Sequence, residues 1–549
     1  MSVPPIVSRP WFGPAAIAVT AWIAIVAAID PAGSYPSLLQ GPGLTVDESF
    51  NVQQGVYLAE CVRHYGLGLL DLESIREVFD GKLYLADHPP LGRLWLGWHH
   101  QAAWSLAPPA EPDGIIVTAC ARTGSATALA LTILLIGWFT GKTFGPLAGL
   151  LAAAILPLMP RIWGHAHLAS LETITNLTCT AAVLAMAHGW NQSTPPTVRA
   201  SLLAGAWLGL AFLTKIQAIF LPLSMIVWAI WRWRTNSWKP LLLWGLAAGA
   251  VFFLGWPWLW LDPIGHGYAY FARTTARATL SVWYFGMKYS DREVPWHYPW
   301  VMFAATIPLT TLFAGGFSLF RWSTKIAHSP QERSARLLLL GNIVLPLVAF
   351  SLPGVAVYDS ERLFLTVFPF WAILAAHGVT QLLDVIPSGW KRNIAVGMLA
   401  IVLLFQGATL IALAPCSLDD YSRLVGQAQG AEHLGLETCY WGDAVTRDLL
   451  EDAVAHVPEG GELLVSPVLH LFQLEDLRQQ SPILRRHQVM LAPYQGTPRP
   501  GQFLLIFRRR ADLPDELRFG PHNAELMAEV RRQSTQLAGL YRFLPDSPP

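Results

Sequence analysis

A succession of long apolar segments is the feature that most constrains how this chain can fold. A helix that crosses the hydrocarbon core of a bilayer needs about 20 mostly apolar residues. Such segments lie at 14–30, 115–138, 144–160, 170–190, 201–214, 216–232, 240–260, 300–320, 337–353, 361–383 and 394–413. Only 13% of the residues are charged, against roughly 25% in soluble domains. The sequence therefore predicts a polytopic α-helical membrane protein with about eleven spans.

Basic connectors between these segments predict the orientation. They are "RWRTNSWK" (232–239), "RWSTKIAHSPQERSAR" (321–336) and "KRN" (391–393). Parity places all three on one side of the membrane, and the excess of Lys and Arg in cytoplasmic loops makes this side the cytoplasmic one, together with the N-terminus. We take segment 91–107, which contains Arg93, His99 and His100, to lie along the outer interface without crossing; if it crossed, the acidic loop before it would move to the inside.

Composition divides the chain into two parts. Residues 1–414 hold the apolar segments, and 31–114 form a first outer loop in which we expect interfacial helices. From 415 to 549, short apolar runs alternate with charged helix-like runs, which is typical of a small soluble α/β domain. This tail is predicted to be extracytoplasmic. Cys416 and Cys439 lie in it, and either a disulfide or two free thiols fits their positions.

Ionisable residues gather at the predicted outer ends of the apolar segments. They are Asp47, Glu48, Asp87, His88, Arg161, His165, His167, Glu172, Lys215, His297, Glu361 and Arg362. Any one of them could be a side chain that reaches to the interface, but acids, histidines and isolated cations on one face are together typical of a functional site. Lys215 is the most unusual, because apolar sequence lies on both sides of it.

A carboxylate and isolated cations at a membrane surface fit the transfer of a group from a lipid-linked phosphate. The phosphate leaves as an anion and needs no proton, so cations that bind it stabilise the developing charge. The acceptor hydroxyl needs a general base, and a carboxylate can supply one. The chain has 37 basic and 37 acidic residues, so no excess of positive charge indicates binding to nucleic acid.

The order of the motifs resembles the C-class integral membrane glycosyltransferases, which use polyprenyl-phosphate sugars. The resemblance is carried by the acidic pair at 47–48, "HPPL" (88–91), the acid at the second outer turn, "LTK" (213–215) and "ERLFLTVFPFWAILAAHG" (361–378). The group of protein O-mannosyltransferases and bacterial aminoarabinose transferases is the most similar. "DDYSRLVGQAQGAEHLGLETCYWGDA" (419–444) also resembles a stretch that follows the last span in bacterial members.

This resemblance implies an inverting glycosyltransferase, with 1–414 as the catalytic domain, at the outer face of a bacterial inner membrane. Asp47 would be the base that activates the acceptor hydroxyl, and Glu48 beside it would orient the substrate. The donor phosphate would be held by Lys215 and Arg362, with His88 helping. The partners implied are a polyprenyl-phosphate-sugar donor and a lipid, glycan or protein acceptor.

Further positions carry less defined roles. Glu172 matches a second acidic position of the group, where relatives usually have Asp. His297 in "PWHYPW" could line the acceptor entrance, and an interfacial aromatic belt explains the Trp and Tyr of this stretch equally well. No cofactor is required, although some relatives bind a divalent metal near these acids. His165, His167 and Glu172 could therefore ligate Zn, Mg or Mn, and a polar turn at the interface is the alternative.

Two other classes of function remain open at this point. A transporter or lipid flippase would also be polytopic, but such proteins often show paired halves with broken helices and charges near the midplane, which this sequence lacks. A scaffold subunit that docks through its tail would explain 415–549 but not the acidic pair or Lys215.

Overall fold

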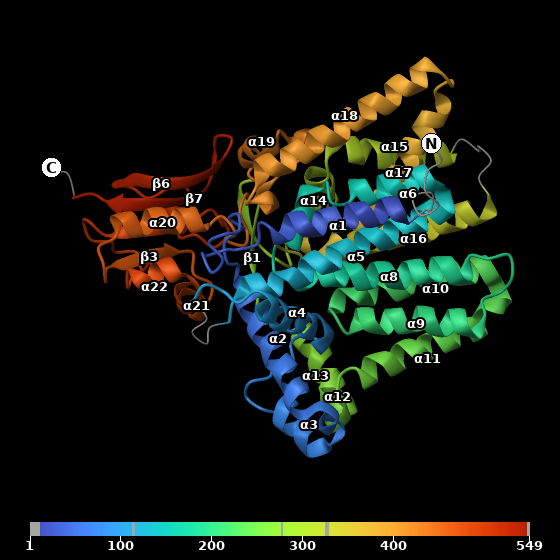
Figure 1. Ribbon diagram of the computed structural model, residues 1–549, viewed down its shortest axis with the longest axis horizontal. Coiled ribbons are helices and arrows are strands. Elements are labelled where there is room, and N and C mark those ends of the chain that lie inside the picture. Colours follow the sequence, from blue (N-terminus) through green and yellow to red (C-terminus); the bar gives the residue numbers. More distant parts are fainter. Residues whose placement is uncertain (1–10, 112–115, 276–277, 324–328, 546–549) are drawn as a thin grey trace.

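The computed structural model describes residues 11–111, 116–275, 278–323 and 329–545. The residues outside these ranges are 1–10, 112–115, 276–277, 324–328 and 546–549, and they include parts of several predicted segments. The described chain is mostly helical. A bundle of long helices forms one part, and a small sheet with its own helices lies at one end of this bundle (Figure 1).

The bundle contains a helix for every predicted apolar segment. Its members are α1 (Phe12–Val26), α5 (Thr118–Phe144), α6 (Pro146–Ile155), α7 (Pro160–Ala166), α8 (Leu171–Trp190), α9 (Val198–Phe212), α10 (Leu221–Trp233), α11 (Trp238–Leu254), α14 (Tyr298–Thr306), α15 (Leu309–Ser323), α16 (Pro330–Phe350), α17 (Phe368–Val385) and α18 (Trp390–Leu413). The helical class of the protein is therefore confirmed.

When candidate spans are counted by helix length and composition, the structure gives fewer spans than the sequence predicts. Five stretches of the described chain are long and apolar enough to cross a membrane: Thr118–Phe144, Ile216–Leu254, Pro330–Phe350, Arg362–Val385 and Trp390–Leu413. Two bent helix pairs, α6 with α7 and α14 with α15, raise the number to seven. The expected eleven is not confirmed, because helices such as α1, with 15 residues, reach only about 22 Å of a core about 30 Å thick.

The described parts of the basic connectors lie at the end of the bundle that is remote from the C-terminal sheet (Figure 1). Figure 1 shows α10 and α11 joined there at Arg234–Ser237. At the same end, the Asn191 side chain donates a hydrogen bond to the Gln331 carbonyl at 2.6 Å, and Arg232 donates one to the Gln192 carbonyl at 2.7 Å. The connectors near 191, 232 and 331 are therefore neighbours in space.

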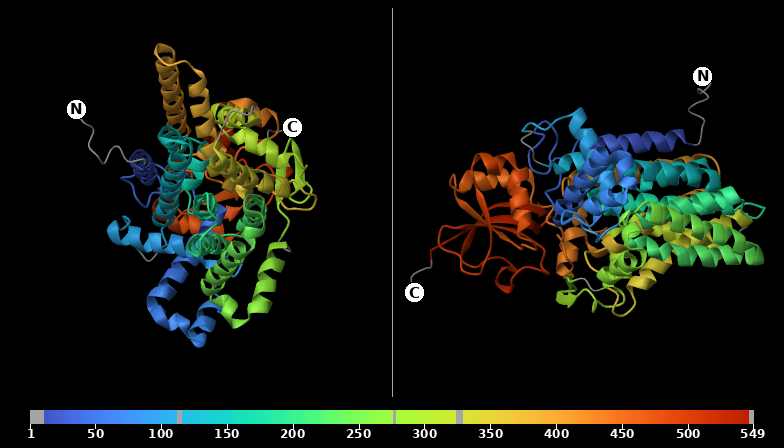
Figure 2. Two further views of the ribbon diagram at one scale, coloured as in Figure 1. Left: turned by 90° about the vertical axis from the view of Figure 1, so that its right-hand side faces the viewer. Right: turned by 90° about the horizontal axis from the view of Figure 1, so that it is seen from below.

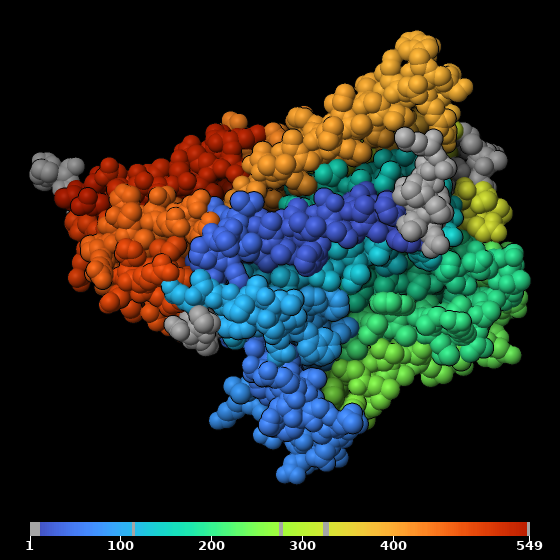
Figure 3. Space-filling view, viewed as in Figure 1, coloured from blue at the N-terminus to red at the C-terminus, as the bar shows by residue number. Residues whose placement is uncertain are grey.

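The first outer loop forms three helices: α2 (Val46–Tyr65), α3 (Leu72–Phe79) and α4 (Pro90–Leu106). Both α2 and α4 run across the bundle axis instead of along it, and α2 and α3 form a lobe that projects beyond the bundle (Figures 1, 2 and 3). Helix α4 covers the segment predicted to lie along the interface, and it is not among the candidate spans of the described chain. Its first residue is Pro90, which suits a helix start because proline has no N–H to leave unpaired.

The loop 262–299 is also partly structured. It holds α13 (Pro263–Thr275), which follows the short helix α12 (Trp258–Leu261). A hairpin of β1 (Ser281–Tyr284) and β2 (Met287–Ser290) precedes α14.

The C-terminal part contains a five-stranded mixed sheet in the order β4-β3-β5-β7-β6. The strands are β3 (Glu462–Ser466), β4 (Met490–Pro493), β5 (Phe503–Phe507), β6 (Ala524–Arg532) and β7 (Thr535–Phe543). Strand β3 is parallel to both β4 and β5. Strand β7 is antiparallel to both β5 and β6. The helices of this part are α19 (Gln427–His433), α20 (Arg447–His456), α21 (Phe472–Gln480) and α22 (Pro482–Arg486). The expected mixture of strands and helices is confirmed, and the boundary at 415 stays a prediction.

This tail packs closely on the end of the bundle where α2 begins. The Gly43 amide donates to the Asp443 carbonyl at 2.7 Å, and a side-chain carbon at position 43 would lie 2.1 Å from the Val445 carbonyl oxygen. Only glycine permits so close an approach of the two backbones. The Ser422 amide also donates to the Ala305 carbonyl at 2.7 Å, so the tail contacts both an early loop and a late helix of the bundle.

Candidate functional site

Arg362 brings together acids from three separate segments of the chain. Its Nε donates to Oε1 of Glu172 at 2.7 Å, its Nη1 to Oδ2 of Asp359 at 2.9 Å, and its Nη2 to Oδ2 of Asp47. Arg362 opens the 3-10 helix η4 (Arg362–Val367), directly before α17, and its side chain is 8% exposed. A buried guanidinium needs such partners, because an unpaired charge in this position is strongly unfavourable.

Lys215 joins this group through Glu172. Its Nζ donates to Oε1 of Glu172 at 2.5 Å, and both side chains are buried. Glu172 lies in the first turn of α8, whereas Lys215 follows the end of α9. The carboxylate of Glu172 therefore bridges two cations and reduces the repulsion between them. We call Asp47, Glu172, Lys215, Asp359 and Arg362 the Asp47 cluster.

Asp47 is the most accessible member of the cluster. Its side chain is 27% exposed, while the other four side chains are at most 8% exposed. Burial raises the pKa of Asp47, and the nearby Arg362 charge opposes this effect. A carboxylate with a raised pKa is a stronger base, so Asp47 combines partial access with basicity.

The turn before Arg362 has an unusual backbone. Asp359 and Ser360 both have positive φ, 55° and 58°, a region that residues other than glycine rarely adopt. The Ser360 amide donates to the Tyr298 hydroxyl at 2.9 Å, and the Asp359 carboxylate is held by Arg362. Strained backbone persists where surrounding contacts determine it and is frequent at functional sites. These contacts fix the direction in which Arg362 leaves the turn.

Two residues of the C-terminal part reach the Asp47 cluster, and the sequence did not indicate either of them. The Trp441 ring lies 4.4 Å from the Arg362 guanidinium carbon, and Nη1 of Arg509 lies 3.1 Å from Oδ1 of Asp359. The only available signal was that "CYWGDA" (439–444) belongs to the stretch that resembles bacterial relatives. The tail is therefore part of the surroundings of Arg362.

Glu48 points away from Asp47 and is fully buried. Its Oε1 accepts hydrogen bonds from Nε of Arg122 at 2.8 Å and the Ala169 amide at 2.6 Å. Its Oε2 accepts from Nη2 of Arg122 at 2.8 Å and the Thr45 amide at 3.0 Å. Glu48 thus anchors the start of α2, and the substrate-orienting role expected for it is not supported by its position.

Glu361 also turns away from its neighbour Arg362 and enters a second buried network. Its carboxylate lies 3.6 Å from Nη1 of Arg161 and 3.6 Å from Nε2 of His165. The Tyr440 hydroxyl, from the C-terminal part, donates to it at 3.5 Å. Consecutive residues therefore serve two different contacts, one with the Asp47 cluster and one with α7 and the tail.

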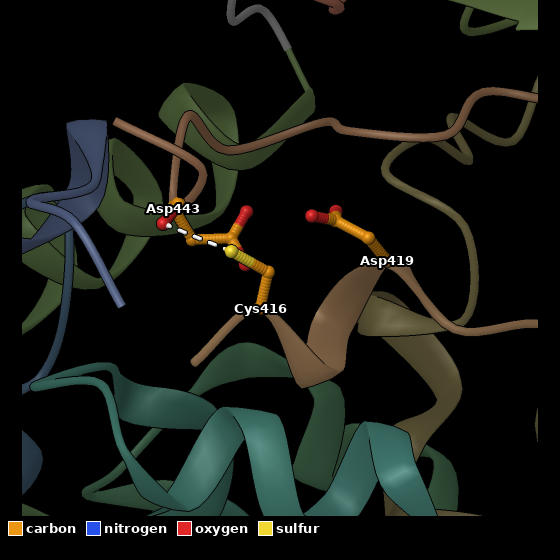
Figure 4. A group of neighbouring side chains, drawn as sticks. All are labelled: Cys416, Asp419 and Asp443. Atoms are coloured by element: carbon orange, nitrogen blue, oxygen red, sulfur yellow. Dashed lines mark hydrogen bonds between the residues drawn. The ribbon is translucent and has the colours of Figure 1, made fainter. Parts of the chain in front are cut away.

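The structure does not gather His165, His167 and Glu172 into a metal site. His165 faces Glu361, His167 bonds through Nδ1 to the Trp163 carbonyl at 2.8 Å, and Glu172 is held by Lys215 and Arg362. Within the described chain, side chains with metal-ligand spacing are found elsewhere, at Cys416, Asp419 and Asp443 (Figure 4).

The two remaining predicted residues differ in their placement. His88 is partly buried and lies close enough to Lys215 and Glu172 to be affected by their charges. Burial lowers the pKa of His88 to about 3, against the opposing effect of Asp87, so this imidazole is neutral at pH 7. His297 lies against the hairpin, with Nδ1 2.8 Å from the Tyr284 hydroxyl, and no contact with the Asp47 cluster is found for it in the described chain.

Residues 117–260 match the family model of dolichyl-phosphate-mannose-protein mannosyltransferases. The chain resembles this family. The matched segment includes Glu172 and Lys215 of the Asp47 cluster, and the resemblance expected from the motifs is confirmed over it. A search of curated protein sequences gives no match.

Several solved structures are similar to the whole chain or to most of it. ArnT from Cupriavidus metallidurans in the apo state has 14% sequence identity and a TM-score of 0.49, with 96% of each chain covered. The same protein bound to undecaprenyl phosphate has 16% identity and a TM-score of 0.47, again with 96% of each chain covered. The Archaeoglobus fulgidus oligosaccharyltransferase has 11% identity and a TM-score of 0.44, covering 73% of this chain and 55% of that one.

The Glu48–Arg122 pair predicts a large effect on stability. Glu48→Gln leaves the Arg122 charge buried without a counter-charge, which costs about 3–5 kcal/mol of unfolding free energy. Thermal or denaturant unfolding of the purified protein in detergent measures this loss. Glu475→Gln is the matched control, because Glu475 pairs with Arg478 at the surface and such pairs contribute at most about 1 kcal/mol. Equal stability of the two variants would contradict the anchoring role of Glu48.

Proposed function

We propose that this protein transfers a sugar from a polyprenyl-phosphate donor to a hydroxyl acceptor at the outer face of the membrane. The observation that carries the proposal is the Asp47 cluster, in which two buried cations meet a partly exposed carboxylate. The match to a family described by a lipid-phosphate sugar donor supports the same reaction class.

In this mechanism Lys215 and Arg362 bind the donor phosphate. Both are buried and both contact Glu172, so their charges are held close together before the donor arrives. Arg can present two parallel N–H groups to phosphate, whereas Lys acts as a compact charge. The phosphate leaves as an anion, and the two cations stabilise the charge that develops on it. His88, as a neutral imidazole nearby, contributes a hydrogen bond instead of charge.

Asp47 acts as the general base. Without a donor, its carboxylate is paired with Nη2 of Arg362. A donor phosphate competes for the same guanidinium, and this competition frees Asp47 to accept the proton of the acceptor hydroxyl. Direct attack of that hydroxyl on the anomeric carbon breaks the bond to the phosphate oxygen and inverts the configuration.

The proposed orientation rests on the two ends of the bundle. The connector at Arg234–Ser237, within the basic segment 232–239, lies remote from the C-terminal sheet, and Lys and Arg are enriched in cytoplasmic loops. The opposite end, with Asp47 and the C-terminal part, then faces the outside. We therefore place the protein in the inner membrane of a bacterium, where the polyprenyl-phosphate sugar would be used at the outer face.

Asp47→Asn is expected to reduce sugar transfer by about 100- to 10,000-fold, because the amide cannot accept the hydroxyl proton. Transfer of labelled sugar from polyprenyl-phosphate hexoses and pentoses into envelope lipids, glycans and proteins measures the effect. Glu60→Gln, an exposed acid on the same helix, should leave the rate unchanged. Full turnover by a folded Asp47→Asn variant would exclude Asp47 as the base.

Lys215→Met removes one phosphate-binding charge while keeping an unbranched side chain of similar size. A charge-assisted hydrogen bond contributes about 1.5–3 kcal/mol, so the KM for the donor should rise about 10- to 100-fold. Steady-state kinetics with varied donor and fixed acceptor measure this change. Lys82→Met, at an exposed lysine of the first outer loop, is the control. An unchanged donor KM in Lys215→Met would remove Lys215 from the phosphate site.

Orientation has its own test with single introduced cysteines. Glu459→Cys lies in an exposed turn of the C-terminal part, and Asn236→Cys lies in the exposed connector between α10 and α11. A membrane-impermeant maleimide should label the first variant in intact spheroplasts and the second only after permeabilisation. The reverse pattern would place the Asp47 cluster on the cytoplasmic side.

A further inference from the structure

A separate group of side chains lies where the tail meets the bundle. Cys416 and Asp419 follow α18, at the 3-10 helix η5 (Ser417–Asp419), and Asp443 lies in the loop before α20. All three side chains are buried. In Figure 4 the Asp419 carboxylate points toward the Asp443 carboxylate and the Cys416 thiol. One ligand atom from each residue lies within 4.8 Å of the other two.

These carboxylates have few partners for buried acids. Within the described chain, Oδ1 and Oδ2 of Asp419 have no hydrogen-bond partner, and Oδ2 of Asp443 has none either. Arg161 and Arg532 act on Asp419 through their charges, but Nε of Arg161 and Nη2 of Arg532 donate their hydrogen bonds to backbone carbonyls. Two neighbouring buried carboxylates with so few donors are unfavourable, because each loses its hydration and the two repel each other. A bound cation compensates both effects.

Cys439 lies beside this group and could supply a fourth ligand. Its Sγ lies 3.8 Å from Oδ1 of Asp443, and its thiol interacts with both carboxylates. Like the other three side chains, it is buried, and both Cys416 and Cys439 are free thiols in the structure. One sulfur and two carboxylate ligands therefore surround one point, and a second thiol lies next to them.

This ligand set selects zinc among the common divalent ions. Zinc binds thiolate at about 2.3 Å and carboxylate at about 2.0–2.2 Å in tetrahedral geometry, so neighbouring ligand atoms lie roughly 3.3–3.8 Å apart. The ligand atoms of Cys416, Asp419 and Asp443 lie within 4.8 Å of one another and would need to draw together by about 1 Å, and the Cys439 thiol would turn toward them to complete the set. Magnesium and calcium prefer sets made of oxygen alone.

We propose that Cys416, Asp419, Cys439 and Asp443 form a structural zinc site. Binding releases the two thiol protons and leaves zinc with four protein ligands, so the site has no open position for a substrate. The ion joins the segment after α18 to the loop that carries Tyr440 and Trp441. Because Trp441 packs on Arg362, the zinc site fixes the tail against the Asp47 cluster.

A disulfide between Cys416 and Cys439 is the competing arrangement. It would consume both sulfur ligands and leave Asp419 and Asp443 as buried acids without a cation. The two states differ in zinc content and in the number of free thiols, so they can be separated by measurement.

The test uses the full-length protein, expressed with zinc and purified in detergent without chelator. Elemental analysis should give about one zinc ion per chain for the wild type and for Cys61→Ser, a control at a partly buried thiol on α2. Asp419→Asn and Cys439→Ser should each retain at most about a fifth of that zinc. Replacement of zinc by cobalt should produce a thiolate-to-cobalt absorption band in the wild type.

Three results would overturn the proposal. They are a wild type without zinc or a cobalt band, zinc in Asp419→Asn equal to the wild type, and a Cys416–Cys439 disulfide identified by peptide mass. If Asp419→Asn does not fold, the wild-type zinc content and the cobalt spectrum still decide. Zinc content is measured without sugar transfer, so this proposal and the proposed function can fail independently.

Discussion

The pairing of Arg362 with three carboxylates is the constraint on which the arrangement of the site depends. A guanidinium is planar and carries five N–H donors that point in different directions, so it can contact several acids at once, which a lysine could not do in the same geometry. Its partners belong to α2, α8 and the turn before η4. The buried charge of Arg362 is therefore balanced only when the start of α2, the start of α8 and the turn before η4 lie close together.

Neighbouring residues are used for opposite purposes at two points of the chain. Asp47 faces the cluster while Glu48 is sequestered with Arg122, and Arg362 faces the cluster while Glu361 contacts Arg161 and α7. In a helix, successive side chains diverge by about 100°, so an adjacent pair cannot serve one site equally. The acidic pair in "TVDESF" thus combines an anchor with a candidate base.

The C-terminal part is more than a separate soluble module. Arg509 reaches Asp359, Trp441 covers Arg362, and Tyr440 reaches Glu361. Because these contacts fall on the residues that orient Arg362, a displacement of the tail would alter the arrangement of charges in the Asp47 cluster. The backbone contact of Gly43 with Val445 and the proposed zinc site both hold the tail in this place.

The sequence by itself determined the membrane class, the helical segments, the mixed character of the tail and the set of ionisable residues at one end, because composition and spacing are local properties. It also placed Asp47, Glu172, Lys215 and Arg362 in one group, through the order of the motifs. Only the tertiary structure decided the pairing: Lys215 has no acid beside it in sequence, and its partner lies 43 residues away. The separation of Glu48 from Asp47, the entry of Trp441 and Arg509, and the dispersal of His165, His167 and Glu172 depend on how distant segments pack, which local patterns do not encode.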